Sequence, residues 1–227
     1  MKLFFDMEFT GLHKNTTPIS LGIVSEDGKK FCAEFVDFDV KQCGEWIKEN
    51  VISHLRLPKL LGRNTILETW REKERWKKNG YLVADICLIS DGWLRCVYPT
   101  CRINGDVKEV VGDRPWVNAC LQDWIQQFDS VQFVSDVCHY DFVLLIDILT
   151  NGGTALDLPE NISPACIDLN QEIMRHFQIS SREAFDMSRE QIVHDLCGED
   201  GVVFGDKHNS LYDAEVIHAI CKEIYER

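Results

Sequence analysis

The sequence has no apolar run of the roughly 20 residues that would span a bilayer, and its N-terminal segment lacks the apolar core of a secretion signal. Basic residues are also scarce: 24 Lys and Arg against 37 Asp and Glu give a formal net charge of −13. A protein that coats duplex nucleic acid needs a broad basic face that neutralises phosphates. The shortage of Lys and Arg therefore excludes this class of nucleic-acid-binding protein. A short anionic substrate is still compatible, because bound metal ions invert the local charge. We expect no membrane partner.

None of the ten cysteines belongs to a C-x-x-C pair. Without an export signal, the cysteines are interpreted as reduced thiols that mostly serve as small core residues, and a cytoplasmic protein is expected. Apolar residues make up 45% and charged residues 27% of the 227 positions. That composition excludes a disordered tail, a collagen-like fibre and a disulfide-stapled miniprotein, and it fits a chain with a sizeable core.

Hydrophobic periodicity predicts strands before helices. The predicted extended segments are residues 2–9, 18–25, 31–38, 81–89, 93–98 and 131–134. The predicted helical segments are a charged region within 41–79, then 115–128, 143–149, 168–177 with Asp168 as its N-cap, and a last helix from Ser210. Asp27-Gly28 is a hairpin signal between the second and third strands. This order predicts a mixed α/β domain in which helices cover a central sheet.

Two acidic residues interrupt the first predicted strand. Asp6 and Glu8 are two apart, so both side chains lie on one face, opposite Phe5, Met7 and Phe9. Neighbouring carboxylates repel each other, and a divalent cation relieves that repulsion; oxygen ligands suit Mg²⁺ or Mn²⁺. The alternative is a strand whose polar face meets water.

Two further acidic positions lie at predicted helix starts. Asp141 falls where an apolar strand gives way to an apolar helix, and its alternative role is an N-cap. Asp136 is a rival carboxylate in the same segment. If Ser210 caps the last helix, Asp213 lies in its first turn and His208 just before it; the alternative is a capping box with a solvated histidine. An imidazole with an ordinary pKa of about 6.5 suits a general base at neutral pH.

These segments together resemble the DEDD superfamily of 3′–5′ exonucleases, in the branch with a catalytic histidine. The similarity is carried, in chain order, by Asp6-Met-Glu8-Phe-Thr10-Gly11-Leu12, by Asp141-Phe-Val-Leu-Leu, and by His208-Asn-Ser-Leu-Tyr-Asp213-Ala. Asp136 departs from the pattern, because that position is often His in the family. Within the superfamily, the chain is similar to RNase T, oligoribonuclease and RNase AS, the last through the stretch 167–171.

The resemblance implies an RNase H-like mixed sheet flanked by helices, with 1–227 as a single exonuclease domain and 40–115 as family-variable elements. It implies that two Mg²⁺ or Mn²⁺ ions are held by four carboxylates, those of Asp6, Glu8, Asp141 and Asp213. His208 would take a proton from the attacking water. Thr10 would meet the 3′-hydroxyl region and Leu12 would pack against the terminal base; plain core packing is the alternative for Leu12.

The implied substrate is the 3′ end of single-stranded RNA or a short oligonucleotide, cut to nucleoside 5′-monophosphates by a homodimer. One alternative is a DNA-preferring repair or proofreading exonuclease. Another is a catalytically silent module that binds nucleic acid or dimerises. The basic segment 71–78, with Trp70 and Trp76, is either a track for single-stranded nucleic acid or a solvated helix face.

Overall fold

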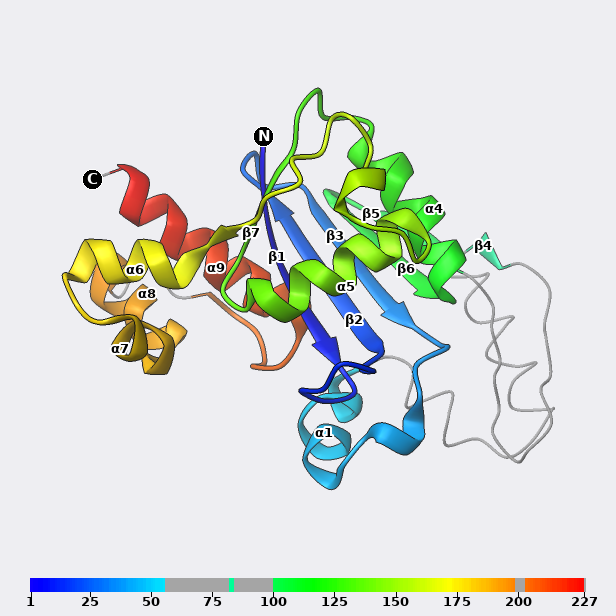
Figure 1. Ribbon diagram of the computed structural model, residues 1–227, viewed down its shortest axis with the longest axis horizontal. Helices are drawn as coiled ribbons and strands as arrows, with labels where there is room; N and C mark the ends of the chain where they lie inside the picture. Colours follow the sequence, from blue (N-terminus) through cyan, green and yellow to red (C-terminus); the bar gives the residue numbers. More distant parts are fainter. Residues whose placement is uncertain (56–81, 84–99, 199–202, 227) are drawn as a thin grey trace.

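The computed structural model describes residues 1–55, 82–83, 100–198 and 203–226 (Figure 1). The described strands are β1 (Lys2–Phe9), β2 (Pro18–Ser25), β3 (Lys30–Phe35), β4 (Leu82–Val83), β5 (Thr100–Asn104), β6 (Val107–Gly112), β7 (Gln132–Ser135) and β8 (Ile167–Asp168). The described helices are α1 (Glu45–Asn50), α4 (Arg114–Ile125), α5 (Cys138–Thr150), α6 (Leu169–Phe177), α7 (Ser181–Asp186), α8 (Arg189–Cys197) and α9 (Ser210–Glu226). Short 3₁₀ turns occupy Val40–Gln42, Ile52–His54 and Ala155–Asp157.

The described strands form one mixed sheet in the order β4-β5-β6-β3-β2-β1-β7-β8. The pairs β1–β2, β2–β3, β4–β5 and β5–β6 are antiparallel, whereas β3–β6, β1–β7 and β7–β8 are parallel. A mixed sheet of this kind, covered by helices, is the α/β RNase H-like architecture that the sequence predicted.

Helices cover both faces of the sheet, and β1 lies between them. Leu3, Phe5 and Met7 of β1 pack in one apolar core with residues of α4 and α5, which lie in front of the sheet in Figure 1. Phe4 packs on the other face, in a core shared with α6, α8 and α9. The strand period of two therefore places Asp6 opposite Phe5 and Met7, as predicted, and on the face that α9 covers.

Several predicted elements are confirmed. Asp168 caps α6, because its carboxylate accepts the backbone N–H of Asn170. Pro115 lies in the first turn of α4, where its missing N–H costs nothing. The predicted strand 31–38 ends at Phe35 instead, where β3 stops. Sequence periodicity missed the hairpin of β5 and β6 and the short helices α7 and α8.

Some predictions fall outside the described residues. These are the basic segment 71–78 with its tryptophans, the extended segment 93–98, and most of the helix predicted within 41–79 and the strand predicted at 81–89. That residues 1–227 form a single domain stays a prediction. Among the described helices, none is long and apolar enough to cross a membrane.

Candidate active site

Strand β1 presents Asp6 and Glu8 to the site. Both lie on the face covered by α9, and the pairing with β2 shifts register between Glu8 and Phe9, as a β-bulge does. Asp6 is paired with Gly22 on β2. A Cβ at Gly22 would lie 2.3 Å from the backbone of Ser210 and Leu211, so this glycine lets the start of α9 lie close to the acidic strand.

The start of α9 brings two more side chains to this face. Asn209 caps the helix, since its side-chain oxygen accepts the backbone N–H groups of Leu211 and Tyr212. The predicted cap at Ser210 is therefore wrong by one residue. Asp213 sits one turn into the helix, and its carboxylate accepts the backbone N–H of His208 at 2.9 Å. This contact holds His208 in a left-handed conformation, with φ of 65°.

Asp141 reaches the site from the first turn of α5. Its side chain is 1% exposed and accepts a hydrogen bond of 2.7 Å from the hydroxyl of Ser135, at the end of β7. The alternative role as an N-cap is wrong, because Val137 occupies that position and makes no side-chain cap. A buried carboxylate that does not cap its helix is available for another role.

The four acids and the histidine line one cavity of about 820 Å³. Within it, ligand atoms of Glu8, His208 and Asp213 lie within 4.8 Å of one another. Those of Asp6, Asp136 and Asp141 form a second group with the same spacing. The two groups are joined through β1, which carries both Asp6 and Glu8. Residues from three distant parts of the chain thus meet in one place.

Burial and mutual repulsion shape the electrostatics of this cavity. Burial, followed by the charges of neighbouring carboxylates, raises the pKa of Asp6 and of Glu8 well above their ordinary values. Burial also raises the pKa of Asp141, partly offset by the Ser135 hydrogen bond. The pKa of Asp213 is raised to about 7, chiefly by burial and then by the charge of Asp136.

Such a set of acids fits divalent cations. The donors are carboxylate oxygens, which Mg²⁺ and Mn²⁺ prefer over softer ligands. A group that resists ionisation because of burial and like charges is stabilised in its ionised form by a nearby cation. The four predicted acids, Asp6, Glu8, Asp141 and Asp213, could hold such ions, and the same two groups also contain His208 and Asp136.

His208 lies beside this acidic set. Its Nδ1 is 3.8 Å from an oxygen of Glu8, and its ring meets Trp46 edge to face with the ring centroids 4.8 Å apart. Burial, and then the charge of Lys207, lowers the pKa of His208 below its ordinary value. The imidazole is therefore mainly neutral at pH 7, in the form that accepts a proton.

The two predicted substrate residues differ in placement. Leu12 lines the cavity and is 73% exposed, so the core-packing alternative is wrong. Thr10 is fully buried, and its hydroxyl donates to Gln42 at 2.6 Å and accepts the backbone N–H of Thr17. Thr10 holds the turn after β1 and is not among the residues that line the cavity.

Other residues of the cavity were not predicted as site residues. Trp46 and Phe185 line it with more than half of their surface exposed, and Arg189 lines it beside Asp136. Trp46 lies in a charged segment where nothing in the local pattern distinguishes it. Asp136 did carry a signal, as a second carboxylate five residues before Asp141.

Comparison with known proteins gives a partial similarity. No family model matches the chain. Over 75 residues, the chain is 29% identical to a 3′–5′ exoribonuclease of Mycobacterium tuberculosis, and the same match occurs in two strains. The matched segment is 33% of this chain, and the chain spans about two fifths (40%) of the length of these curated relatives. The chain is thus similar over part of its length to a 3′–5′ exoribonuclease.

Proposed function

We propose that the chain is a metal-dependent 3′–5′ exonuclease of the DEDD superfamily, in the branch with a catalytic histidine. It removes nucleoside 5′-monophosphates from the 3′ end of single-stranded RNA or short oligonucleotides. One observation carries this proposal: Asp6, Glu8, Asp141, His208 and Asp213, which come from three separate motifs, line one cavity. The partial similarity to a 3′–5′ exoribonuclease supports the same chemistry.

Two divalent cations, Mg²⁺ or Mn²⁺, fit the charge of the site. Asp6, Glu8, Asp141 and Asp213 supply four negative charges when ionised, which two dications balance before the substrate phosphate enters. When bound, such ions stabilise the charge that develops on the attacking and leaving oxygens of a phosphodiester. The burial and mutual repulsion that raise the pKa of these carboxylates make their ionised forms dependent on a nearby cation.

His208 is the proposed general base. Its lowered pKa keeps the imidazole neutral at pH 7, so it accepts a proton from the water that attacks the terminal phosphate. The contact between Asp213 and the backbone of His208 fixes the loop that carries the ring. Trp46 packs against one side of the ring and limits its orientations.

RNA is the proposed substrate because of the partial similarity to an exoribonuclease. Single-stranded ends suit the cavity, since the exposed Leu12, Trp46 and Phe185 line it and apolar and aromatic side chains stack on unpaired bases. The net charge of −13 is compatible with this mode, because an end bound by cations and stacking needs no long basic track.

The proposal is tested with 5′-labelled single-stranded oligonucleotides and Mn²⁺. We expect stepwise 3′ shortening and release of nucleoside 5′-monophosphates, with RNA cut faster than DNA of the same sequence. Asp213→Asn should abolish shortening, and His208→Asn should lower kcat by about 10²–10⁴-fold. Asp195→Asn, an exposed acid on α8 that does not line the cavity, is the matched control and should retain activity. No shortening by the wild-type protein, or full activity of Asp213→Asn, would reject the proposal.

A further inference from the structure

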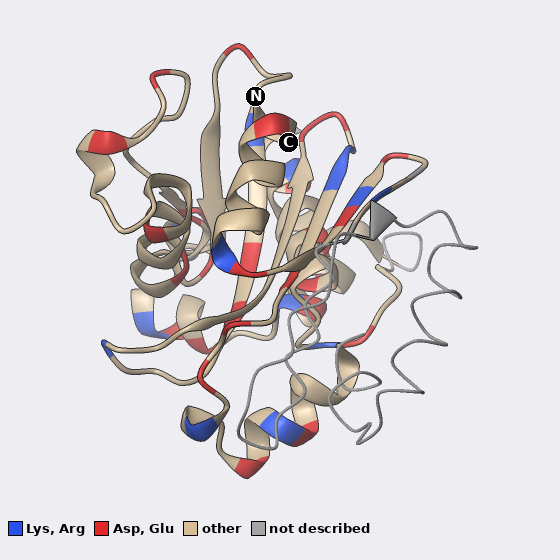
Figure 2. Cartoon of the chain, turned by 90° about the vertical axis from the view of Figure 1, so that its right-hand side faces the viewer, with Lys and Arg blue, Asp and Glu red and all other residues tan. Residues whose placement is uncertain are grey.

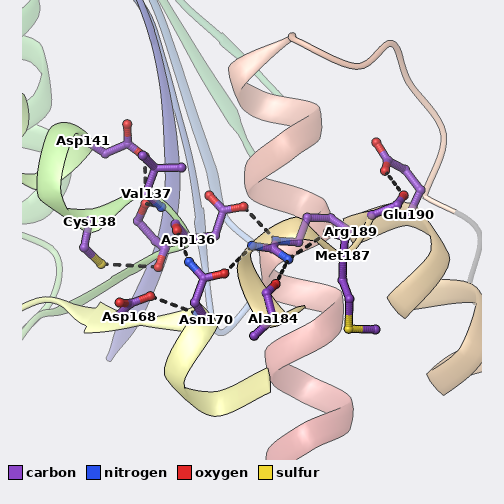
Figure 3. Close-up of polar contacts among 12 residues, drawn as sticks. Asp136, Val137, Cys138, Asp141, Asp168, Asn170, Ala184, Met187, Arg189 and Glu190 are labelled. Carbon is purple, nitrogen blue, oxygen red and sulfur yellow. Dashed lines mark hydrogen bonds and ion pairs between the residues drawn. The ribbon is translucent and has the colours of Figure 1, made fainter. Parts of the chain in front are cut away.

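Arg189 makes a partly buried network beside the acidic residues (Figure 3). Its Nε donates to the carboxylate of Asp136 at 2.9 Å, and its terminal nitrogens donate to the carbonyls of Ala184 and Met187 and to the side chain of Asn170. The side chains of Arg189 and Asp136 are 15% and 16% exposed. Asn170 in turn donates to the backbone carbonyl of Asp136. Asp136 is therefore held at two points, its carboxylate by Arg189 and its backbone carbonyl by Asn170.

Asp136 belongs to the acidic cavity as well as to this network. One of its carboxylate oxygens lies within 4.8 Å of ligand atoms of both Asp6 and Asp141. Burial is the main cause of the raised pKa of Asp6, Asp141 and Asp213, and the charge of Asp136 raises each of them further. Four carboxylates are assigned to the proposed ions, so Asp136 is a fifth negative charge at the same site.

We propose that Asp136 and Arg189 are positioning residues that set how tightly the cavity binds its divalent cations. This inference rests on the proposed function. The carboxylate of Asp136 strengthens cation binding through its charge next to Asp6 and Asp141. Arg189 fixes the carboxylate of Asp136 and offsets its charge. Arg189 therefore limits the affinity of the cavity for cations. In the cation-free protein, it also leaves the partly buried Asp136 with a compensating charge.

A purely structural ion pair makes a different prediction. If the pair only joins α8 to the segment between β7 and α5, removing either partner destabilises the protein without a consistent effect on cation affinity. If the pair tunes the site, the two removals act in opposite directions, because one deletes a negative and the other a positive charge. Coulomb interactions over a few ångströms at an effective dielectric constant of about 20 exceed the 1.4 kcal/mol that corresponds to a tenfold change in affinity.

The test uses the full chain without substrate, titrated with Mn²⁺. Fitting the rise in Tm to its dependence on ln(1 + [Mn²⁺]/Kd) gives the apparent Kd, which is the free Mn²⁺ concentration that half-saturates the folded protein. Asp136→Asn should raise this concentration about tenfold, whereas Arg189→Gln should lower it by a similar factor. The double variant restores the charge balance and should lie within about threefold of the wild type. Arg175→Gln, in an ion pair with Glu172 on α6, is the matched control and should leave the titration unchanged, because neither residue lines the cavity.

The outcomes separate this inference from the proposed function. A wild-type protein that Mn²⁺ does not stabilise contradicts the proposed metal site itself. A stabilised wild type with both single variants weakened, or neither changed, overturns only the role of Asp136 and Arg189. If Arg189→Gln does not fold, a weakened Asp136→Asn together with a restored double variant still supports the inference, and a double variant as weak as Asp136→Asn overturns it.

Discussion

Individual carboxyl groups of the site carry an energetic cost in the cation-free protein. Asp6, Glu8 and Asp141 have a pKa raised well above the ordinary value, and the pKa of Asp213 is raised to about 7. Each unit by which folding raises the pKa of an acid costs about 1.4 kcal/mol of stability once the group is ionised. These residues therefore lower the stability of the cation-free protein, and a cation bound at the proposed site would offset that cost.

This cost predicts a pH dependence of folding. Between about pH 5 and pH 7, the folded state holds protons on these acids that the unfolded state has lost, so the free energy of unfolding should fall as pH rises. His208 and His218 act in the opposite direction, because burial lowers the pKa of each, but they are two groups against four. The measurement is denaturant unfolding in the presence of a chelator at several pH values.

Two comparisons isolate the acids as the cause. Asp213→Asn should flatten the slope, because the amide does not titrate, and saturating Mn²⁺ should reduce it, since bound cations favour the ionised carboxylates. Asp195→Asn should leave it unchanged. Stability that rises with pH over this window in the cation-free protein would show that the acids are not desolvated as described.

At this scale, the sequence predicted which residues meet in the cavity better than it predicted which residues cap the helices. Alternation along a strand is a local property, so the shared face of Asp6 and Glu8 was predictable. The start of α9 at Ser210 was predicted, but its cap was placed one residue late, because Asn209 and Ser210 are both good caps and tertiary contacts decide between them. The pairing of Asp136 with Arg189 joins residues 53 positions apart, and local patterns cannot predict it.

The element that fixes the site geometry is α9, held against β1 and β2. Gly22 on β2 faces the backbone at the helix start, where a Cβ would lie 2.3 Å from atoms of Ser210 and Leu211. The helix cannot lie this close over a larger residue. The first turn of α9 carries Asp213, and the preceding loop carries His208. The distance between the start of α9 and β2 therefore sets the position of both side chains.

Gly22→Ala therefore tests the role of this packing. The added methyl must push the start of α9 away, and we expect a loss of about 1–3 kcal/mol in the free energy of unfolding, together with reduced nuclease activity. Chemical denaturation and the oligonucleotide assay measure the two effects. Gly44→Ala is the control for stability, because a Cβ there meets nothing within 4 Å. A stable and fully active Gly22→Ala would contradict the close approach.

Elements with strong periodicity were predictable, and those defined by their partners were not. The buried strand β1 and the amphipathic helix α9 carry their signal in the sequence itself. β8 covers only Ile167–Asp168 and exists because it pairs with β7, and α7 is a six-residue helix defined by its capping box. Short elements of this kind depend on neighbours that the sequence does not identify.

For the whole molecule, the strand order explains how distant motifs meet. β1 lies between β2 and β7, so the helix that follows β7 and the helix that packs on β1 and β2 both start near the acidic strand. Figure 2 shows Lys and Arg scattered over the described elements. This distribution agrees with the proposal that the protein binds the 3′ end of a nucleic acid, because such binding needs no long basic track. The homodimer implied by the family resemblance stays a prediction that a sizing column tests.

The central claim is that Asp6, Glu8, Asp141 and Asp213 together hold a pair of divalent cations. Equilibrium dialysis against Mn²⁺, with a nucleoside 5′-monophosphate present, measures this most directly by counting ions per chain. The account predicts two ions bound to the wild-type protein and a loss of binding in Asp6→Asn, with Asp195→Asn unchanged. A wild-type protein that binds fewer than two ions, or an Asp6→Asn variant that binds as many as the wild type, would contradict it.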